Sequence, residues 1–294
     1  MTTTPDPADN EHGYVIDAED AAEMARLLEQ DALITRAMGG LFPERGDKLA
    51  GMNDILDVAC GPGGWALNVA REYPDSEVTG IDISERMIKY ARAHAQARRL
   101  PNVNFQVMDI LQPLAFADAS FDLVNARMLF AVMNPESWAS LLREMARVCR
   151  PGGTIRLTEV EFPITTSPRF EELTSKFLQA MHQTHRSFAP DARNFCITPV
   201  LIRLLRDAGC EDVYWKAHGF NFAAQTDAHE GFMQDFMIAY QLASPFLLGL
   251  ELLKKEEFEM LHQQMVAEML TDDFCAIMYG LTACGTRPYE KEDH

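Results

Sequence analysis

The residues best placed to do chemistry lie in one short stretch, ILDVACGPGGWALNVA, from Ile55 to Ala70. An apolar segment runs here into a glycine cluster and then into a sequence typical of a helix. Glycines let the backbone turn tightly and approach a ligand, and the N-terminus of the following helix offers N–H groups that have no partner inside the helix. The stretch therefore predicts a site for a nucleotide-like ligand.

The side chains around the glycines indicate what kind of ligand this is. The spacing Gly61-x-Gly63-x-x-Ala66 satisfies the dinucleotide fingerprint, so the glycines alone leave NAD(P) open. Asp57 precedes Gly61 by four residues, and its carboxylate would repel a pyrophosphate but attract an ammonium or sulfonium group. Pro62 also removes an N–H that a phosphate cradle would use. Together the acid and the proline favour a cationic cofactor.

Titratable residues later in the chain could serve the reaction itself. His182 and His185, in MHQTHRSF, could meet on one helical face as a base or a metal pair, but the absence of matching ligands nearby favours a surface or packing role. Glu159 and Glu161 follow the fifth predicted strand on the same side, either facing an acceptor or standing as solvated loop acids. We take His182, His185 and Glu161 as the candidate catalytic residues, and we expect no metal.

Alternating strands and helices must position these residues. Strands are expected at 54–59, 77–82, 103–109, 121–126 and 154–162, with helices between them at 64–73, 84–99 and 135–148. Strands joined by helices of this length form right-handed crossovers, which predicts a parallel sheet with helices on both faces. Pro151-Gly152-Gly153 is expected to turn the chain into the fifth strand.

The two ends of the chain depart from this alternation. A helical segment runs from Asp17 to Gly39-Gly40, where the glycines mark its end. Beyond residue 163 we expect helices at 168–186, 198–208 and 227–270 and strands at 212–220 and 273–285. Two helical insertions therefore lie between the late strands.

Five segments, in order along the chain, resemble the motifs of the class I S-adenosylmethionine-dependent methyltransferases. DVACGPGG resembles their first motif, GIDIS the second, VMDI the third and FDLVNARMLF the fourth. LLREMARVCRPGGTIRLTE is similar to the region that follows in the small-molecule, ubiquinone/menaquinone-type branch. The resemblance covers about residues 50 to 160. It implies a Rossmann-like α/β fold whose mostly parallel sheet has seven strands in the order 3-2-1-4-5-7-6, with an antiparallel last strand and a helical cap.

The resemblance also implies which residues hold S-adenosylmethionine. Asp82 would bind both ribose hydroxyls, Ile83 would line the adenine, and Asp109 would lie near the adenine amino group. Asn125 would lie near the methionyl part and Arg127 at the cofactor or the substrate, unless both only make structural hydrogen bonds at a polar strand end. The expected cofactor-binding residues are Tyr14, Arg36, Asp57, Ala59, Gly61, Gly63, Asp82, Ile83, Met87, Asp109, Ile110, Asn125 and Arg127.

Four regions are expected along the chain. They are a disordered lead (1–13), an N-terminal helical lid (14–45), the cofactor-binding α/β core (46–163), and the rest of the core with cap insertions at about 165–195 and 226–272 (164–294). By the resemblance, the lid brings Tyr14 and Arg36 to the cofactor. The insertions are rich in Phe and Met, which predicts a roomy pocket for an apolar or aromatic acceptor unless these side chains only form a core or a dimer interface.

Composition limits the partners. A formal net charge of −18 and a pI near 4.8 disfavour nucleic acids and anionic membrane surfaces, since such partners are bound largely through Lys and Arg. The N-terminus lacks the basic and apolar regions of a secretory signal, so we expect a cytoplasmic protein, either a monomer or a homodimer.

The sequence thus predicts an enzyme of small-molecule or secondary metabolism. It would transfer a methyl group from S-adenosylmethionine by in-line displacement to oxygen or carbon of a mainly apolar or aromatic small molecule, leaving S-adenosylhomocysteine. The alternatives are an NAD(P)-dependent oxidoreductase, from the shared glycine spacing, and a methyltransferase-like protein that binds the cofactor but catalyses a non-methylating reaction.

Overall fold

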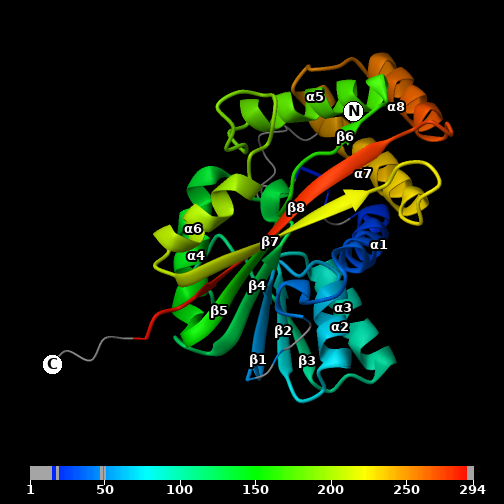
Figure 1. Cartoon of the computed structure of the whole chain (residues 1–294). Coiled ribbons are helices and arrows are strands. Elements are labelled where there is room, and N and C mark those ends of the chain that lie inside the picture. Colours follow the sequence, from blue (N-terminus) through cyan, green and yellow to red (C-terminus); the bar gives the residue numbers. More distant parts are fainter. Residues whose placement is uncertain (1–14, 18–19, 47–48, 50, 290–294) are drawn as a thin grey trace, which may run out of the picture.

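The structure is a computed structural model that describes residues 15–17, 20–46, 49 and 51–289. The expected lead, residues 1–13, and Tyr14 lie outside the described residues. The chain folds around one mixed β-sheet with helices on both faces and a group of helices beyond one end (Figure 1).

The first five strands run parallel in the order β3-β2-β1-β4-β5. They are β1 (Asp54–Val58), β2 (Glu77–Asp82), β3 (Val103–Val107), β4 (Phe121–Arg127) and β5 (Cys149–Val160). The last strand, β8 (Ala276–Thr286), is antiparallel to β5 and pairs on its other side with β7 (Glu211–Asn221). Counting the long strands alone, this confirms the predicted order 3-2-1-4-5-7-6. The structure adds a two-residue strand, β6 (Ile164–Thr165), that also pairs with β8.

Helices cover both faces of the sheet because the central strands are buried on both sides. On one face, α2 (Gly64–Glu72) and α3 (Glu85–Arg98) pack with Ile55 and Leu123. On the other face, α4 (Pro135–Val148) and α6 (Leu201–Asp207) pack with Leu56 and Val124. Adjacent residues of β1 and β4 therefore belong to opposite cores, as the two-residue period of a strand requires.

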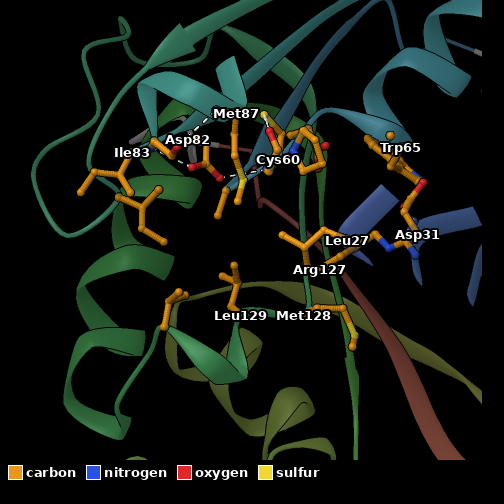
Figure 2. Close-up of a pocket in the computed structure, with 18 of the residues that line it drawn as sticks. Leu27, Asp31, Cys60, Trp65, Asp82, Ile83, Met87, Arg127, Met128 and Leu129 are labelled. Atoms are coloured by element: carbon orange, nitrogen blue, oxygen red, sulfur yellow. Dashed lines mark hydrogen bonds and ion pairs between the residues drawn. The ribbon is translucent and has the colours of Figure 1, made fainter. Parts of the chain in front are cut away.

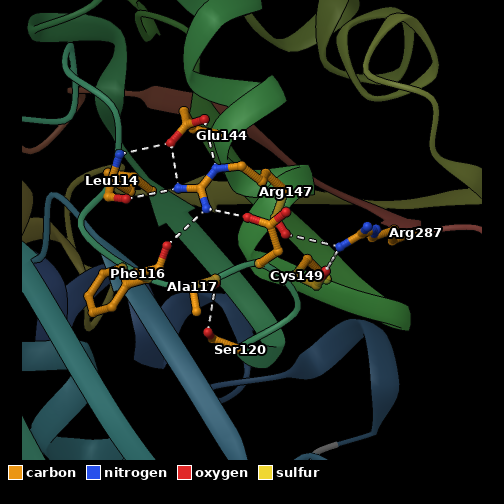
Figure 3. Close-up of polar contacts among 9 residues, drawn as sticks. Leu114, Phe116, Ala117, Ser120, Glu144, Arg147, Cys149 and Arg287 are labelled. Atoms are coloured by element: carbon orange, nitrogen blue, oxygen red, sulfur yellow. Dashed lines mark hydrogen bonds and ion pairs between the residues drawn. The ribbon is translucent and has the colours of Figure 1, made fainter.

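The loop into β4 is held by Arg147 of α4 (Figure 3). Its guanidinium donates to the carbonyl oxygens of Leu114 and Phe116 and to the carboxylate of Glu144, which in turn accepts from Leu114 N at 2.8 Å. The hydrogen bond from Arg147 holds the pKa of Glu144 below its usual range. Arg287, after β8, donates to the carbonyl oxygens of Arg147 and Cys149. This network fixes the start of β4, whose far end carries Asn125 and Arg127.

Four longer helices lie beyond the carboxyl ends of the parallel strands (Figure 1). They are α1 (Ala21–Met38), α5 (Pro168–Gln183), α7 (His229–Gly249) and α8 (Lys255–Met269). Helix α1 is unbroken, begins at the N-cap Asp20 and ends at Gly39 in the left-handed conformation. It packs against α7 through a buried ion pair of 2.6 Å between Arg26 and Asp235. Three short 3-10 turns are η1 (Pro43–Arg45), η2 (Leu129–Ala131) and η3 (Thr198–Val200).

Two sequence predictions need correction. Pro151-Gly152-Gly153, predicted to be a turn before the fifth strand, lies inside β5, where Cys149 pairs with Phe121 ahead of a shift in register. The third strand ends at Val107, so Asp109 follows it rather than ending it. In the described part of the chain, no helix is long and apolar enough to cross a membrane.

Candidate functional site

A cavity of about 560 Å³ opens at the carboxyl ends of β1, β2 and β4 (Figure 2). This is where open α/β sheets bind ligands. Its walls come from α1 and from the segments that follow β1, β2, β3 and β4. Nine of the predicted cofactor-binding residues line it: Asp57, Ala59, Gly61, Asp82, Ile83, Met87, Asp109, Ile110 and Arg127.

The glycine turn forms one wall of the cavity through Cys60, Gly61, Pro62 and Gly64, whereas Gly63 faces the core and does not line it. Gly63 is the N-cap of α2 with φ +81°, a backbone conformation that favours glycine. A Cβ on Gly63 would lie 2.7 Å from the Phe105 ring, so the turn packs directly on the core. Cys60 N donates to Ile81 O at 2.8 Å, which ties the turn to the end of β2. The turn is thus held in a fixed shape beside the ligand space.

Asp82 joins the two loops that flank the cavity. Its Oδ2 accepts from Gly61 N at 2.8 Å and its Oδ1 accepts from Ser84 N at 3.0 Å. These hydrogen bonds set the orientation of the carboxylate at the wall, where Ile83 and Met87 line the same side. The arrangement suits an acid that binds a diol, as the resemblance implies.

Asp57 is buried at the base of the cavity. Its Oδ1 accepts from Asn125 Nδ2 at 2.8 Å. Burial raises the pKa of the Asp57 carboxyl to about 7, although the hydrogen bond from Asn125 and the charge of Arg127 lower it. Asn125 itself does not line the cavity; it lies behind Asp57.

Arg127 ends β4 and meets α1 across the cavity. Its guanidinium lies 3.1 Å from a carboxylate oxygen of Asp31 and donates to Thr35 Oγ1. Burial raises the pKa of Asp31, and the charge of Arg127 opposes this. Among the described residues, Arg127 Nε and Trp65 Nε1 are the buried side-chain nitrogens that have no hydrogen-bond partner, and both side chains line the cavity. A bound group with acceptor oxygens would satisfy them.

Sequence reasoning missed Asp31 and Trp65. Trp65 lies inside the motif but carries no feature of the fingerprint, and Asp31 is one of several acids on an amphipathic helix. Only the position of α1 over the glycine turn brings Asp31 to the cavity: a Cβ on Gly64 would lie 2.7 Å from its carboxylate.

The remaining wall is apolar. It consists of Ile16, Leu27, Ile34, Met128, Leu129, Val132 and Met133. Leu129 is held from behind by Glu159, whose Oε1 accepts from Leu129 N at 2.7 Å. Burial raises the pKa of Glu159 to about 8, and the two backbone donors of Leu129 and Phe130 lower it. Glu159 thus faces η2 and not the cavity.

The candidate catalytic residues do not line the cavity. Glu161 accepts hydrogen bonds from Cys196 N and from the N and Oγ1 of Thr198, so it anchors the segment before α6. His182 is half-buried in the last turn of α5, and His185 is exposed beyond its end. His185 has φ +56°, so the chain has left the helix and the two histidines do not share a helical face.

Two further expectations concern Arg36 and metals. Arg36 is exposed in the last turn of α1, where a cation interacts favourably with the helix dipole, and it does not line the cavity. In the described ranges, no group of three or more His, Cys, Asp or Glu side chains could hold a metal ion.

Comparisons with known proteins agree with this geometry. A family model described as a methyltransferase domain matches residues 55–153. The demethylmenaquinone methyltransferase of Geobacillus kaustophilus is 33% identical over 179 residues, which are 58% of this chain and 75% of that protein. Among solved structures, YcgJ of Bacillus subtilis has a TM-score of 0.51 at 19% identity, covering 86% of this chain and 99% of its own. A phosphoethanolamine N-methyltransferase of Haemonchus contortus, solved with S-adenosylhomocysteine, also has a TM-score of 0.51 at 19% identity, but the match covers 84% of this chain and 52% of that one.

Proposed function

The chain belongs to the class I S-adenosylmethionine-dependent methyltransferases that act on small molecules, and from this premise we propose that the cavity binds S-adenosylmethionine beside a neutral, mainly apolar or aromatic acceptor. The transfer would go to oxygen or carbon of that acceptor. The observation that carries the proposal is the match between the polar groups of the cavity and those of the cofactor.

The methionyl end of the cofactor has an ammonium and a carboxylate, and the cavity offers a partner for each. The Asp57 carboxyl would take the ammonium. The unpartnered Trp65 Nε1 and Arg127 Nε would take the carboxylate, since buried donors without partners are costly. At the other end, Asp82 would hold the ribose and Asp109 the adenine amino group. When bound, the cofactor supplies a methyl group on a positively charged sulfur, open to in-line displacement.

The chain's own contribution is to orient the reactants and exclude water. Helix α1 lines the cavity with Leu27, Gln30, Asp31 and Ile34, and we propose that it acts as the lid of the region 14–45. Its ion pair with α7, between Arg26 and Asp235, links this helix to the cap insertion at 226–272. These helices would select the acceptor.

Charge argues for a neutral acceptor. The cavity lining contains Asp17, Asp31, Asp57, Asp82, Glu85 and Asp109, and a single cationic side chain among the described residues, Arg127, which is already paired with Asp31. An anionic acceptor would be repelled by this lining. The wall around Leu129 is apolar and would contact an aromatic or alkyl body.

Calorimetric titration tests the cofactor. S-adenosylhomocysteine should bind to the full chain and NADH should not, because the carboxylates oppose a pyrophosphate. Transfer of labelled methyl from S-adenosylmethionine should then be detected with the reduced, quinol form of demethylmenaquinone, the acceptor in the name of the Geobacillus kaustophilus relative, and not with phosphoethanolamine. Binding of NADH alone would overturn the proposal, and methylation of phosphoethanolamine would overturn the acceptor class.

Cofactor affinity should depend on pH through Asp57. Its raised pKa of about 7 leaves the carboxyl neutral and protonated below that pH, where an ammonium gains little from it. S-adenosylhomocysteine affinity should therefore fall by about tenfold per pH unit below 7. The titration should span pH 5 to 7.5, below the range in which an amino group loses its proton. D57N should bind more weakly at pH 7.5 and lose this dependence; a D57N profile that still falls like that of the unaltered protein would contradict the assignment.

A further inference from the structure

We propose that Arg156 and Asn125 are positioning residues for the methionyl end of the cavity, connecting it to the N-terminal segment through Glu44. Neither Arg156 nor Glu44 lines the cavity, so they would act only through their neighbours. The proposal rests on the assignment of this cavity to S-adenosylmethionine.

The connection is a chain of short polar contacts across four elements. Arg156 of β5 donates from Nε to Glu44 Oε1 of η1 at 2.8 Å and from a terminal nitrogen to Asn125 Oδ1 of β4 at 2.8 Å. Asn125 Nδ2 then donates to Asp57 Oδ1 of β1 at 2.8 Å. Because Arg156 occupies the amide oxygen, the amide nitrogen must face Asp57. Arg156 thereby fixes which way the amide points.

The same arginine holds the second polar group of the methionyl end. Its guanidinium carbon lies 5.9 Å from the centre of the Trp65 ring and 5.6 Å from that of Phe42. Trp65 is therefore held between the sheet and the N-terminal segment, with its Nε1 unpartnered at the cavity. Arg156 therefore helps to position both the Asp57 carboxyl, which would take the ammonium, and Trp65 Nε1, which would take the carboxylate.

The burial of this chain argues for a role beyond holding strands together. Arg156 is 1% exposed and Asn125 is 0% exposed. A buried ion pair is often no more stabilising than apolar side chains of similar size. At the opposite end of the same three strands, Arg150 of β5 bridges Asp54 of β1 and Asp122 of β4 near the surface. We therefore attribute the buried Arg156–Glu44 pair at the cavity end to the orientation of the Asn125 amide and the Trp65 ring.

Glu44 also limits the electrostatic effect of the Arg156 charge on Asp57. By pairing with Arg156, it leaves Asp57 a neutral amide donor in place of a direct ion pair. The negative charge of Asp57 then remains for a cationic ligand. The amide hydrogen bond lowers the pKa of Asp57 against the effect of burial, so its loss should make the carboxyl harder to ionise.

Titration of the ligand-free protein tests the positioning directly. The full chain, labelled with ¹³C at aspartate carboxyls, would be followed by NMR between pH 5 and 9, with D57N assigning the signal. N125L and R156K should each raise the midpoint of Asp57 by about one pH unit or less, because the amide no longer donates or is no longer oriented. E44Q serves as a third variant should either of these fail to fold: it keeps the shape of Glu44 but no longer neutralises Arg156, so the Asp57 midpoint should fall.

R150M is the matched control. It removes a cation that ties the same strands at their other end, so its Asp57 midpoint should equal that of the unaltered protein. An unchanged midpoint in N125L and R156K, or an equal shift in R150M, would overturn the proposal.

Binding of S-adenosylhomocysteine separates this inference from the proposed function. The pH at which affinity begins to fall should move with the NMR midpoint in each variant. If the variants shift the Asp57 midpoint but the unaltered protein binds no S-adenosylhomocysteine, the cofactor assignment fails and the positioning of Asp57 stands. If the unaltered protein binds S-adenosylhomocysteine and no variant shifts the midpoint, the cofactor assignment stands and the positioning of Asp57 fails.

Discussion

Replacing Gly63 by alanine should lower the free energy of unfolding by about 2 to 5 kcal/mol and abolish measurable binding of S-adenosylhomocysteine. Two costs add at this residue. Its φ of +81° is strained for any residue with a Cβ, and the new Cβ would lie 2.7 and 2.8 Å from two atoms of the Phe105 ring and 3.0 Å from the Ala91 Cβ. Phe105 is fully buried, so its ring cannot move aside without displacing its neighbours in the core. Chemical denaturation measures the loss.

Gly39 serves as the control that distinguishes backbone strain at positive φ from steric overlap of the new Cβ. It ends α1 with φ +91°, and no atom would lie within 4 Å of a Cβ there. G39A therefore reports the cost of the left-handed conformation alone, about 1 to 2 kcal/mol. F105L in the G63A background should recover part of the stability, because it removes ring atoms from the contact. Equal losses in G39A and G63A, with no recovery from F105L, would contradict the role given to Phe105.

The sheet could be predicted because its signals are local. β1, β2 and β4 are each followed by a helix that returns the chain to a parallel strand, and such a connection is almost always a right-handed crossover. Ser84 and Asn134, read as helix starts, do accept hydrogen bonds from Met87 N and Ser137 N. The exceptions are set by the neighbouring strand. Pro151-Gly152-Gly153 resembles a turn, yet pairing with β4 draws it into β5.

The residues of the site also differ in whether local sequence or tertiary packing places them. Asp57, Gly61 and Asp82 could be found because each lies at a strand end, and the carboxyl ends of parallel strands meet at one edge. Asp31 could not be found, since only the tertiary position of α1 brings it to Arg127. The same is true of Arg156: in sequence it is one arginine in a strand, and its role depends on η1 lying beside β5.

His182 and His185 do not share a helical face, for a local reason. The spacing of His182 and His185 suits a helix, but α5 ends at Gln183 and the next residues turn. Glu161 lies just beyond β5, and its carboxylate is used by Cys196 and Thr198. A sequence pattern gives the type and spacing of side chains; which backbone donors reach them depends on loops of variable path.

Replacing Asp82 by alanine should weaken S-adenosylhomocysteine binding by about 1 to 3 kcal/mol, or roughly 5- to 150-fold. Two losses contribute. The ribose would lose a charged acceptor, and Gly61 N and Ser84 N would lose the carboxylate that joins their loops. Calorimetry at pH 7.5, where the raised pKa of Asp57 no longer limits binding, gives the affinity directly.

Asp122 provides the matched control for this loss. Its Oδ2 accepts from Asn53 N and Asp54 N, both at 2.9 Å, at the amino ends of the strands and outside the cavity lining. D122A removes a carboxylate with the same number of backbone donors, so it should lower stability to a similar extent while leaving S-adenosylhomocysteine affinity within about twofold. Affinity that is unchanged in D82A, or reduced equally in both variants, would show that Asp82 supports the loops without contacting the cofactor.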